Sequence, residues 1–194
     1  MKKIQDHYFK EARKQGYVAR SAFKLEEMDR KFRLLRRGQH VIDLGCAPGS
    51  WLQYAAKKVL PEGSLTGVDL KQVKIQFPES VRIFQSDISM LEESILASSR
   101  FDLVLSDMAP DTTGIPSMDS QRSYDLNSQA LSFAQRHLKP GGTLVLKAFQ
   151  GEPLNRLKSE IRPCFESFKL FKPKSSRSES VEIFVLGFGL LSQS

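Results

Sequence analysis

One stretch of the sequence constrains the fold more than any other. It reads Val41-Ile42-Asp43-Leu44-Gly45-Cys46-Ala47-Pro48-Gly49-Ser50-Trp51. An apolar run typical of a β-strand ends near an acid, passes through two glycines and a proline, and enters residues 51–59, whose pattern predicts a helix. A strand, tight loop and helix start of this kind is where an open α/β sheet binds a nucleotide-like ligand. The glycines let the main chain approach that ligand, and we expect Asp43 to place a fixed negative charge at the end of the strand.

The loop excludes two common nucleotide sites. A dinucleotide-binding fold would show G-x-G-x-x-G, and a P-loop would end in Gly-Lys-Ser/Thr; residues 41–51 contain neither pattern. These residues fit a ligand with an adenosine and a cationic end, such as S-adenosylmethionine. On this stretch alone, a Gly/Pro turn in an unrelated α/β protein remains the alternative.

Length and charge narrow the class of protein. With 194 residues, the chain is expected to form one domain with a substantial core. Its 29 Lys+Arg against 22 Asp+Glu leave a net charge of +7, which favours a polyanionic partner, although a basic protein without such a partner would have the same composition. The two cysteines, Cys46 and Cys164, allow no disulfide framework or zinc cluster and indicate a reducing compartment.

The first residues carry no signal for secretion. Residues 1–6 are basic but lack the apolar segment of a signal peptide, and no apolar run reaches membrane-spanning length, so we expect a cytoplasmic protein that does not bind membranes. Residues 1–20 form a basic arm with aromatic residues interleaved. This mixture suits binding of a nucleic acid backbone, and a solvated terminal helix is the equal alternative.

Patterns of strand and helix alternate along the rest of the chain. An amphipathic helix is expected from Ser21 to Phe32, with Lys24 among its apolar residues. Further strands are expected at 64–70, 81–85, 101–106, 143–149, 167–171 and 181–187, further helices at 89–97, 121–138 and 154–161, and a polar loop at 111–120. Because no helix joins the last two strands, they predict a hairpin. The fold class is therefore α/β, a mostly parallel seven-stranded sheet with one antiparallel strand and helices on both faces.

Acids stand at the ends of four expected strands: Asp43, Asp69, Asp87 and Asp107. Ligands of open α/β sheets lie outside the carboxyl ends of the strands. Asp69 is expected to accept both hydroxyls of an adenosine ribose, or else to form a turn. Asp87 can accept from an adenine amine or cap the helix expected to follow it. Trp51 can shield the ligand loop or simply pack in the core.

A second group of charged residues lies in apolar surroundings. Lys147 interrupts an apolar strand, where it must reach solvent or be held by a carboxylate, because an unpaired buried charge is costly. Lys24 lies on an apolar helix face, Asp107 follows a strand, and Glu182 opens the last strand. Together these two lysines and two acids indicate one shared polar site, although each taken singly is more often a snorkelling lysine or a turn residue.

Taken together, the motifs resemble the FtsJ-type (RrmJ or RlmE) ribosomal RNA 2′-O-ribose methyltransferases over nearly the whole chain. The matching segments are residues 16–25 (GYVARSAFKL), 43–51 (DLGCAPGSW), 106–110 (SDMAP), 146–151 (LKAFQG) and Ser175-Ser176-Arg177 to Glu182. Glu182 matches better than Glu179, because Glu182 directly precedes the apolar strand. The family loop usually reads Ala-Pro-Gly-Gly-Trp, so Ser50 is a departure, and the main chain there must avoid a conformation reserved for glycine.

The resemblance implies a Rossmann-like, S-adenosylmethionine-dependent methyltransferase fold, with residues 1–194 as a single methyltransferase domain. It implies a catalytic tetrad of Lys24, Asp107, Lys147 and Glu182, and a cofactor pocket lined by Gly49, Trp51, Asp69, Asp87 and Asp107. The implied reaction is methylation of an RNA ribose 2′-hydroxyl. Because this hydroxyl is a poor nucleophile, we expect Lys147 to act as general base with Asp107 orienting its amine, and this scheme requires no metal. By resemblance, the target is a uridine of ribosomal RNA within the large ribosomal subunit. Because the sequence shows no strongly apolar stretch expected to be exposed, we expect a monomer.

The expected RNA surface has two basic segments. They are Lys2, Lys3, Arg13, Lys14 and Arg20 at one end of the chain and Lys172, Lys174 and Arg177 at the other. Two alternatives remain open: a 2′-O-methyltransferase of messenger or transfer RNA, and a non-catalytic RNA-binding module for ribosome assembly with a vestigial cofactor site. A small-molecule or protein methyltransferase is disfavoured by the basic excess and by the lack of an inserted substrate domain.

Overall fold

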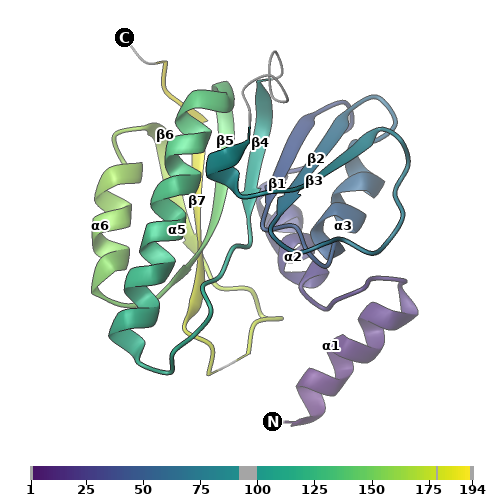
Figure 1. The fold of residues 1–194 in the computed structure, drawn as a ribbon, viewed down its shortest axis with the longest axis horizontal. Helices are drawn as coiled ribbons and strands as arrows, with labels where there is room; N and C mark the ends of the chain where they lie inside the picture. The colour runs from purple at the N-terminus through teal and green to yellow at the C-terminus, as the bar shows by residue number, and fades with distance from the viewer. Residues whose placement is uncertain (1, 92–99, 178, 193–194) are drawn as a thin grey trace.

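The fold is a seven-stranded sheet with helices against both faces (Figure 1). The computed structural model describes residues 2–91, 100–177 and 179–192. Its strands are β1 (His40–Leu44), β2 (Ser64–Asp69), β3 (Val81–Gln85), β4 (Phe101–Ser106), β5 (Leu138–Phe149), β6 (Phe165–Phe171) and β7 (Glu182–Leu190), in the order β3-β2-β1-β4-β5-β7-β6. β1 to β5 pair in parallel, and β7 runs antiparallel to β5 and β6. The predicted sheet with one antiparallel strand is confirmed.

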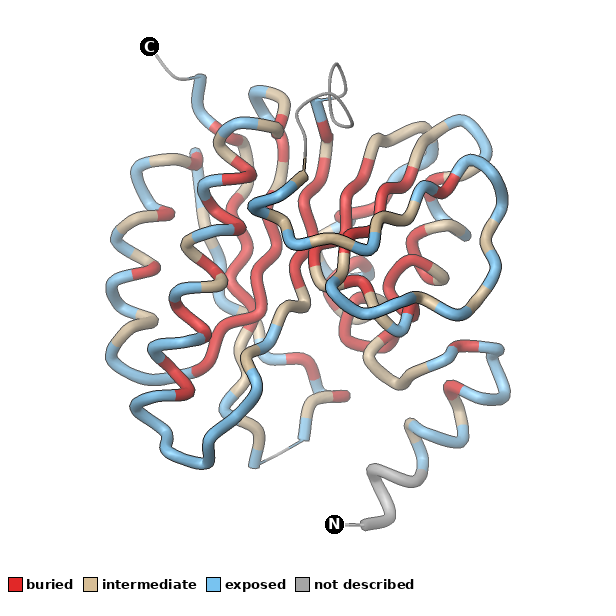
Figure 2. The backbone as a smooth tube through the Cα atoms, in the orientation of Figure 1, coloured by how far each residue is buried: buried red, intermediate tan, exposed pale blue. Residues whose placement is uncertain are grey.

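Alternating side chains of the strands bury two apolar layers. Leu103 and Leu105 of β4 pack in a core with α2 (Ala22–Phe32) and α3 (Ser50–Val59), whereas Val104 packs in a second core with α5 (Pro116–His137) and α6 (Glu152–Ile161). This is the period of two that a strand imposes on its side chains. The strands accordingly form the buried centre of the molecule (Figure 2). No helix in the described part of the chain is long and apolar enough to cross a membrane.

Helix α1 (Lys2–Lys14) stands apart from the sheet, at the edge where the carboxyl ends of β1 and β4 lie (Figure 1). Ala12 is buried, and the ring of Tyr8 lies 5.6 Å from that of Phe23 on α2. The basic arm predicted at this end of the chain is therefore largely helical, with one apolar stripe against the body of the protein.

Several element boundaries differ from the prediction. The loop expected over 111–120 ends early, because α5 begins at Pro116; proline suits the first turn of a helix, where its missing N–H costs nothing. β5 begins at Leu138 rather than at residue 143, since a register shift against β4 lets the Pro-Gly-Gly segment stay in the strand. Of the helix expected at 89–97, the structure describes a 3-10 turn, η1 (Ile88–Met90), and residues 92–99 lie outside the described residues.

Candidate active site

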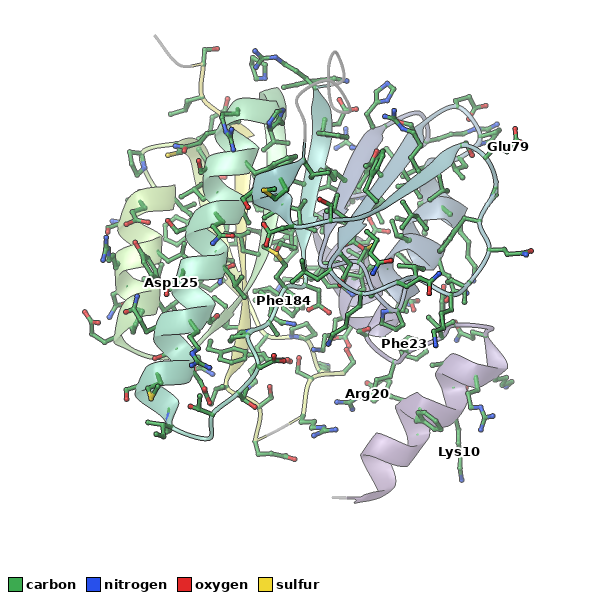
Figure 3. The ribbon with its side chains drawn as sticks, viewed as in Figure 1. Lys10, Arg20, Phe23, Glu79, Asp125 and Phe184 are labelled. Atoms are coloured by element: carbon green, nitrogen blue, oxygen red, sulfur yellow. The ribbon has the colours of Figure 1, made fainter. Side chains whose placement is uncertain are left out.

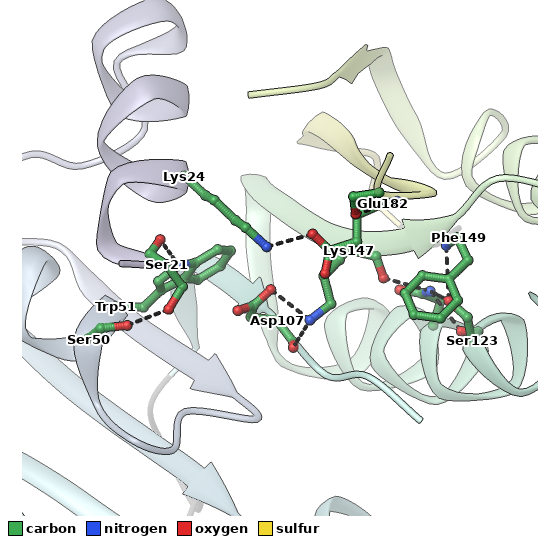
Figure 4. Close-up of polar contacts among 11 residues, drawn as sticks. Ser21, Lys24, Ser50, Trp51, Asp107, Ser123, Lys147, Phe149 and Glu182 are labelled. Atoms are coloured by element: carbon green, nitrogen blue, oxygen red, sulfur yellow. Dashed lines mark hydrogen bonds and ion pairs between the residues drawn. The ribbon is translucent and has the colours of Figure 1, made fainter. Parts of the chain in front are cut away.

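Four charged side chains meet at the carboxyl edge of the sheet. Lys24 Nζ on α2 lies 2.6 Å from Glu182 Oε2 at the start of β7. Lys147 Nζ on β5 lies 2.9 Å from Asp107 Oδ1, just after β4, and donates a hydrogen bond of 2.6 Å to the Asp107 main-chain carbonyl. Figure 4 shows all four side chains in one small space between α2 and β5. The structure thus brings together the four residues that the sequence grouped, and their catalytic roles stay a prediction.

Burial makes these ion pairs obligatory. Lys24 and Lys147 are only 7% and 6% exposed, and an ammonium group so far from water needs a carboxylate partner. Burial disfavours the charged form of Glu182, but the charge and the hydrogen bond of Lys24, together with the charge of Lys147, outweigh it and hold the Glu182 pKa below its ordinary value. The site therefore combines two cations with two anions in a partly desolvated space.

Neighbouring helices fix the main chain that carries the tetrad. Trp51 Nε1 donates a hydrogen bond of 2.8 Å to the Ser21 carbonyl, which ties the start of α3 to the start of α2 and so places Lys24 (Figure 4). On the other side, Ser123 Oγ of α5 accepts a hydrogen bond of 3.1 Å from the N–H of Phe149, two residues after Lys147. Both lysines are therefore held through their main chain as well as through their ion pairs.

A cavity of about 650 Å³ adjoins the tetrad, within the range of ligand sites, about 300–1,000 Å³. Strand ends and α5 line it: Leu44, Gly45, Ala47, Val68, Asp69, Leu70, Lys71, Ser86, Asp87, Ile88, Asp107, Met108, Ala109, Pro110, Asp111, Arg122, Asp125, Leu126 and Gln129. A Cβ at Gly45 would lie 2.7 Å from Met108 Cγ, and the residue has a φ of +78°. Only glycine therefore allows the β1 loop to lie this close to the chain after β4.

Two aspartates of the cavity are oriented by the main chain. Asp69 accepts hydrogen bonds from the N–H of Ala47 through Oδ2 (2.8 Å) and from the N–H of Lys71 through Oδ1 (2.7 Å). Asp87 Oδ1 accepts from the N–H and the hydroxyl of Ser89, so the capping alternative holds for that oxygen. These bonds favour the charged form and lower the Asp87 pKa below its ordinary value.

Comparison with known proteins identifies the family of this chain. The model of the FtsJ-like methyltransferase family matches residues 17–190. This chain is an FtsJ-like methyltransferase. It is 43% identical over 193 residues to "Ribosomal RNA large subunit methyltransferase E" of Oleidesulfovibrio alaskensis, covering 97% of this chain and 93% of the relative. It is 45% identical over 186 residues to the protein of the same name in Desulfatibacillum aliphaticivorans, covering 95% and 90%.

A solved structure agrees with this assignment. A Plasmodium falciparum protein described as a ribosomal RNA methyltransferase superposes with a TM-score of 0.81 at 27% identity, covering 91% of this chain and all of that one. The resemblance that the sequence motifs indicated is therefore confirmed, and with it the expected fold.

In this FtsJ-like methyltransferase, Asp107 belongs to both parts of the site. Its side chain pairs with Lys147, and the same residue lines the cavity together with Asp69 and Asp87. A ligand in the cavity therefore lies beside the paired lysine. In the described part of the chain, no cluster of three or more His, Cys, Asp or Glu side chains could hold a metal ion.

Asp43 is buried at the end of β1. It is 1% exposed, and burial, then the charges of Asp107 and Asp69, raise its pKa well above the ordinary value. Burial therefore opposes the fixed negative charge expected at this strand end, and that expectation stays a prediction.

Gly49 and Trp51 lie outside the cavity lining. Trp51 is buried, with its ring 5.8 Å from that of Phe184, as the packing alternative describes. A Cβ on Gly49 would lie 2.8 Å from Ile75 Cδ1, so the lack of a side chain at Gly49 lets the segment that carries Ile75 pack close to the main chain. Ser50 begins α3 in helical conformation, as its departure from the family loop required.

Sequence reasoning missed the wall of the cavity that α5 contributes. Arg122, Asp125, Leu126 and Gln129 recur at helical spacing, which would have marked one face of this helix. Helical spacing alone does not predict that this face of α5 lies at the edge of the sheet where the cavity is.

Proposed function

We propose that this protein transfers the methyl group of S-adenosylmethionine to a ribose 2′-hydroxyl of large-subunit ribosomal RNA, at a uridine. The observation that carries the proposal is the double placement of Asp107, in the cavity and beside the buried Lys147. The names of the curated relatives support ribosomal RNA of the large subunit as the substrate class.

The carboxylates of the cavity fit an adenosine with a cationic end. Each Asp69 oxygen accepts one main-chain hydrogen bond and retains acceptor capacity for a ribose hydroxyl. An adenine amine would use Oδ2 of Asp87, because Oδ1 holds Ser89. Bound S-adenosylmethionine supplies an electrophilic methyl group on a sulfonium, and the negative charge of Asp107 suits a cation at this end of the cavity.

The tetrad would handle the proton of the attacking hydroxyl. A ribose hydroxyl is a weak nucleophile, so transfer requires a base within hydrogen-bond reach and a fixed direction of attack. Lys147 would first release one ammonium proton to solvent. The neutral amine, held in place by Asp107, would then accept the proton of the hydroxyl as its oxygen bonds to the methyl carbon and the carbon–sulfur bond of the sulfonium breaks. Lys24 and Glu182, joined at 2.6 Å, would orient the hydroxyl from the opposite side.

The RNA surface would lie around this edge. Arg13 and Lys14 at the end of α1 are exposed, as are Lys172, Lys174 and Arg177 between β6 and β7. Figure 3 shows Arg20 and Lys10 on the same edge of the molecule. The contribution of Lys2 and Lys3 to this surface stays a prediction. A monomeric enzyme acting in the cytoplasm on the large ribosomal subunit is the simplest form of the proposal.

A direct test follows methyl transfer from labelled S-adenosylmethionine to large-subunit particles, free ribosomal RNA, transfer RNA and messenger RNA in parallel, with mapping of the methylated ribose. We expect label at one 2′-oxygen of the large-subunit RNA. Preferred transfer to transfer or messenger RNA would overturn the substrate assignment. If calorimetry with S-adenosylmethionine shows no binding while the RNA still binds, the enzyme proposal fails and a binding module remains.

A further inference from the structure

Glu27 links α2 to the loop between β6 and β7. Its Oε2 accepts a hydrogen bond of 2.7 Å from the N–H of Lys174, and its Oε1 accepts one of 2.8 Å from the N–H of Ser175. Both oxygens of one carboxylate thus bind consecutive main-chain amides of a basic loop, residues 172–177. Charged acceptors make the stronger class of hydrogen bond, so this is a specific attachment.

The attachment lies on the same helix face as the tetrad lysine. Lys24, Glu27 and Lys31 are spaced by three and four residues, which places them on one side of α2. Lys24 binds Glu182, after the loop; Lys31 Nζ lies 4.8 Å from the centre of the Phe171 ring, before the loop. The face of α2 therefore contacts the chain just before the loop at Phe171, within it at residues 174 and 175, and beyond it at Glu182.

The loop is also closed on itself. Lys172 Nζ donates a hydrogen bond of 2.8 Å to the carbonyl of Ser180, and the N–H of Ser176 donates one of 3.1 Å to the carbonyl of Pro173. Ser175 is buried against the protein, whereas Lys174 and Arg177 remain exposed. The cations therefore project from a loop whose main chain is fixed.

Glu27 also lies near the N-terminal arm. Burial, and then the charge of Glu27, raises the pKa of Tyr8 on α1. This carboxylate therefore binds the basic loop and also acts electrostatically on Tyr8 of α1. A free carboxylate there would repel phosphate groups, but its charge is met by two main-chain N–H groups.

We infer that Glu27 is a positioning residue for RNA: it fixes the loop 172–177 so that Lys174 and Arg177 hold the RNA backbone while Lys24 and Glu182, carried by the same helix and chain segment, meet the ribose. The inference rests on the proposed function, because it names how that site recognises its substrate. Glu27 touches neither cavity nor tetrad in the described contacts, so it acts through the loop.

The test depends on whether removing the Glu27 charge raises or lowers KM for ribosomal RNA. Glu27→Gln removes a negative charge from a basic surface, so charge alone would strengthen RNA binding and lower KM. If Glu27 positions the loop, the same change raises KM for ribosomal RNA about fivefold, with kcat and the Kd for S-adenosylmethionine within about twofold. Glu26→Gln is the matched control: it removes the same charge one residue away, from a carboxylate that pairs with Arg30, and should not raise KM.

A second variant keeps the charge and shortens the side chain. Glu27→Asp should also raise KM, because the shorter carboxylate cannot reach both amides, whereas a purely electrostatic role predicts no change. Wild-type KM for Glu27→Asp, or a KM for Glu27→Gln that is unchanged or lowered as in the control, would overturn the inference.

Hydrogen exchange separates this inference from the proposed function. Without RNA, amides of residues 172–177 should exchange about tenfold faster in Glu27→Gln than in the wild type, because two protecting hydrogen bonds are weakened. Unchanged exchange would contradict the attachment of the loop by Glu27, and with it the inference, even if the enzyme methylates RNA. Faster exchange in a protein whose wild type methylated none of the RNAs tested would leave the loop attachment standing while the proposed function fails.

Discussion

Asn127 Nδ2 donates a hydrogen bond of 3.0 Å to the main-chain carbonyl of Lys147. The parallel pairing of β4 with β5 ends one residue before Lys147, at Ser106 and Leu146. A side chain of α5, instead of β4, therefore binds the Lys147 carbonyl. Asn127 is 3% exposed and also donates to the carbonyl of Ser123, one turn back on the helix. The strand end that carries the proposed base is therefore held in place by a helix.

Asn127→Ala should lower kcat about 10- to 100-fold, because a small displacement of a catalytic group is costly. The Kd for S-adenosylmethionine should stay near the wild-type value, since Asn127 does not line the cavity. Steady-state kinetics and calorimetry measure the two quantities. Gln135→Ala is a control on the same helix, where the side chain contacts Cys164 instead of β5. Equal losses in both variants would point to general destabilisation of α5.

Lys147→Ala should reduce methyl transfer by about 10²–10⁴-fold, the usual contribution of a general base, while S-adenosylmethionine still binds. Lys139→Ala is the control on the same strand; Lys139 pairs with Asp102 at 2.6 Å, away from the tetrad, and its loss should leave kcat unchanged. Single-turnover transfer of labelled methyl groups measures the effect.

Lys147→Arg distinguishes a base from a fixed positive charge. Arginine keeps the charge and the donors but does not release a proton in proteins, so a general base predicts a loss as large as in Lys147→Ala. Activity restored to within about tenfold of the wild type would assign Lys147 an electrostatic role instead.

The tetrad was predictable because its two lysines interrupt apolar patterns and its two acids stand at the ends of apolar strands. A lysine inside the strand of Lys147 demands a partner, and Asp107 stands at the end of the adjacent parallel strand, so topology alone brings them close. The strands themselves were predictable for a different reason: their apolar runs are short and bounded by turn residues.

Other parts of the site could not be predicted from local pattern. Asn127 is one polar residue in a helix, and its role depends on where β4 stops beside β5. Trp51 directly follows the Gly/Pro loop of residues 45–50, yet it does not line the cavity, and its indole N–H binds the Ser21 carbonyl. The pKa shift of Asp43 arises from burial and from two aspartates distant in sequence, and both are properties of the folded chain.

Asp69→Asn should weaken S-adenosylmethionine binding about 10- to 100-fold, as expected for loss of charged hydrogen bonds, each about 1.5–3 kcal/mol. An amide has one oxygen, whereas Asp69 binds the N–H groups of Ala47 and Lys71 with separate oxygens. Calorimetry measures the Kd. Asp125→Asn removes the same charge from the α5 wall of the cavity and should change the Kd by less than about threefold. A larger loss for Asp125→Asn than for Asp69→Asn would place the cofactor against α5.

Asp43→Asn should change how stability depends on pH. Because the folded-state pKa of Asp43 is raised, the stability that its protonated form contributes is fully present below the unfolded-state pKa, about 3.9, and is lost as pH rises through the folded-state value. Asparagine keeps the shape without ionising, so the free energy of unfolding of the variant relative to wild type should increase from pH 4 toward pH 8. Urea denaturation of both proteins without cofactor measures this difference. Parallel profiles across that range would show that Asp43 ionises as readily in the folded chain as in the unfolded one.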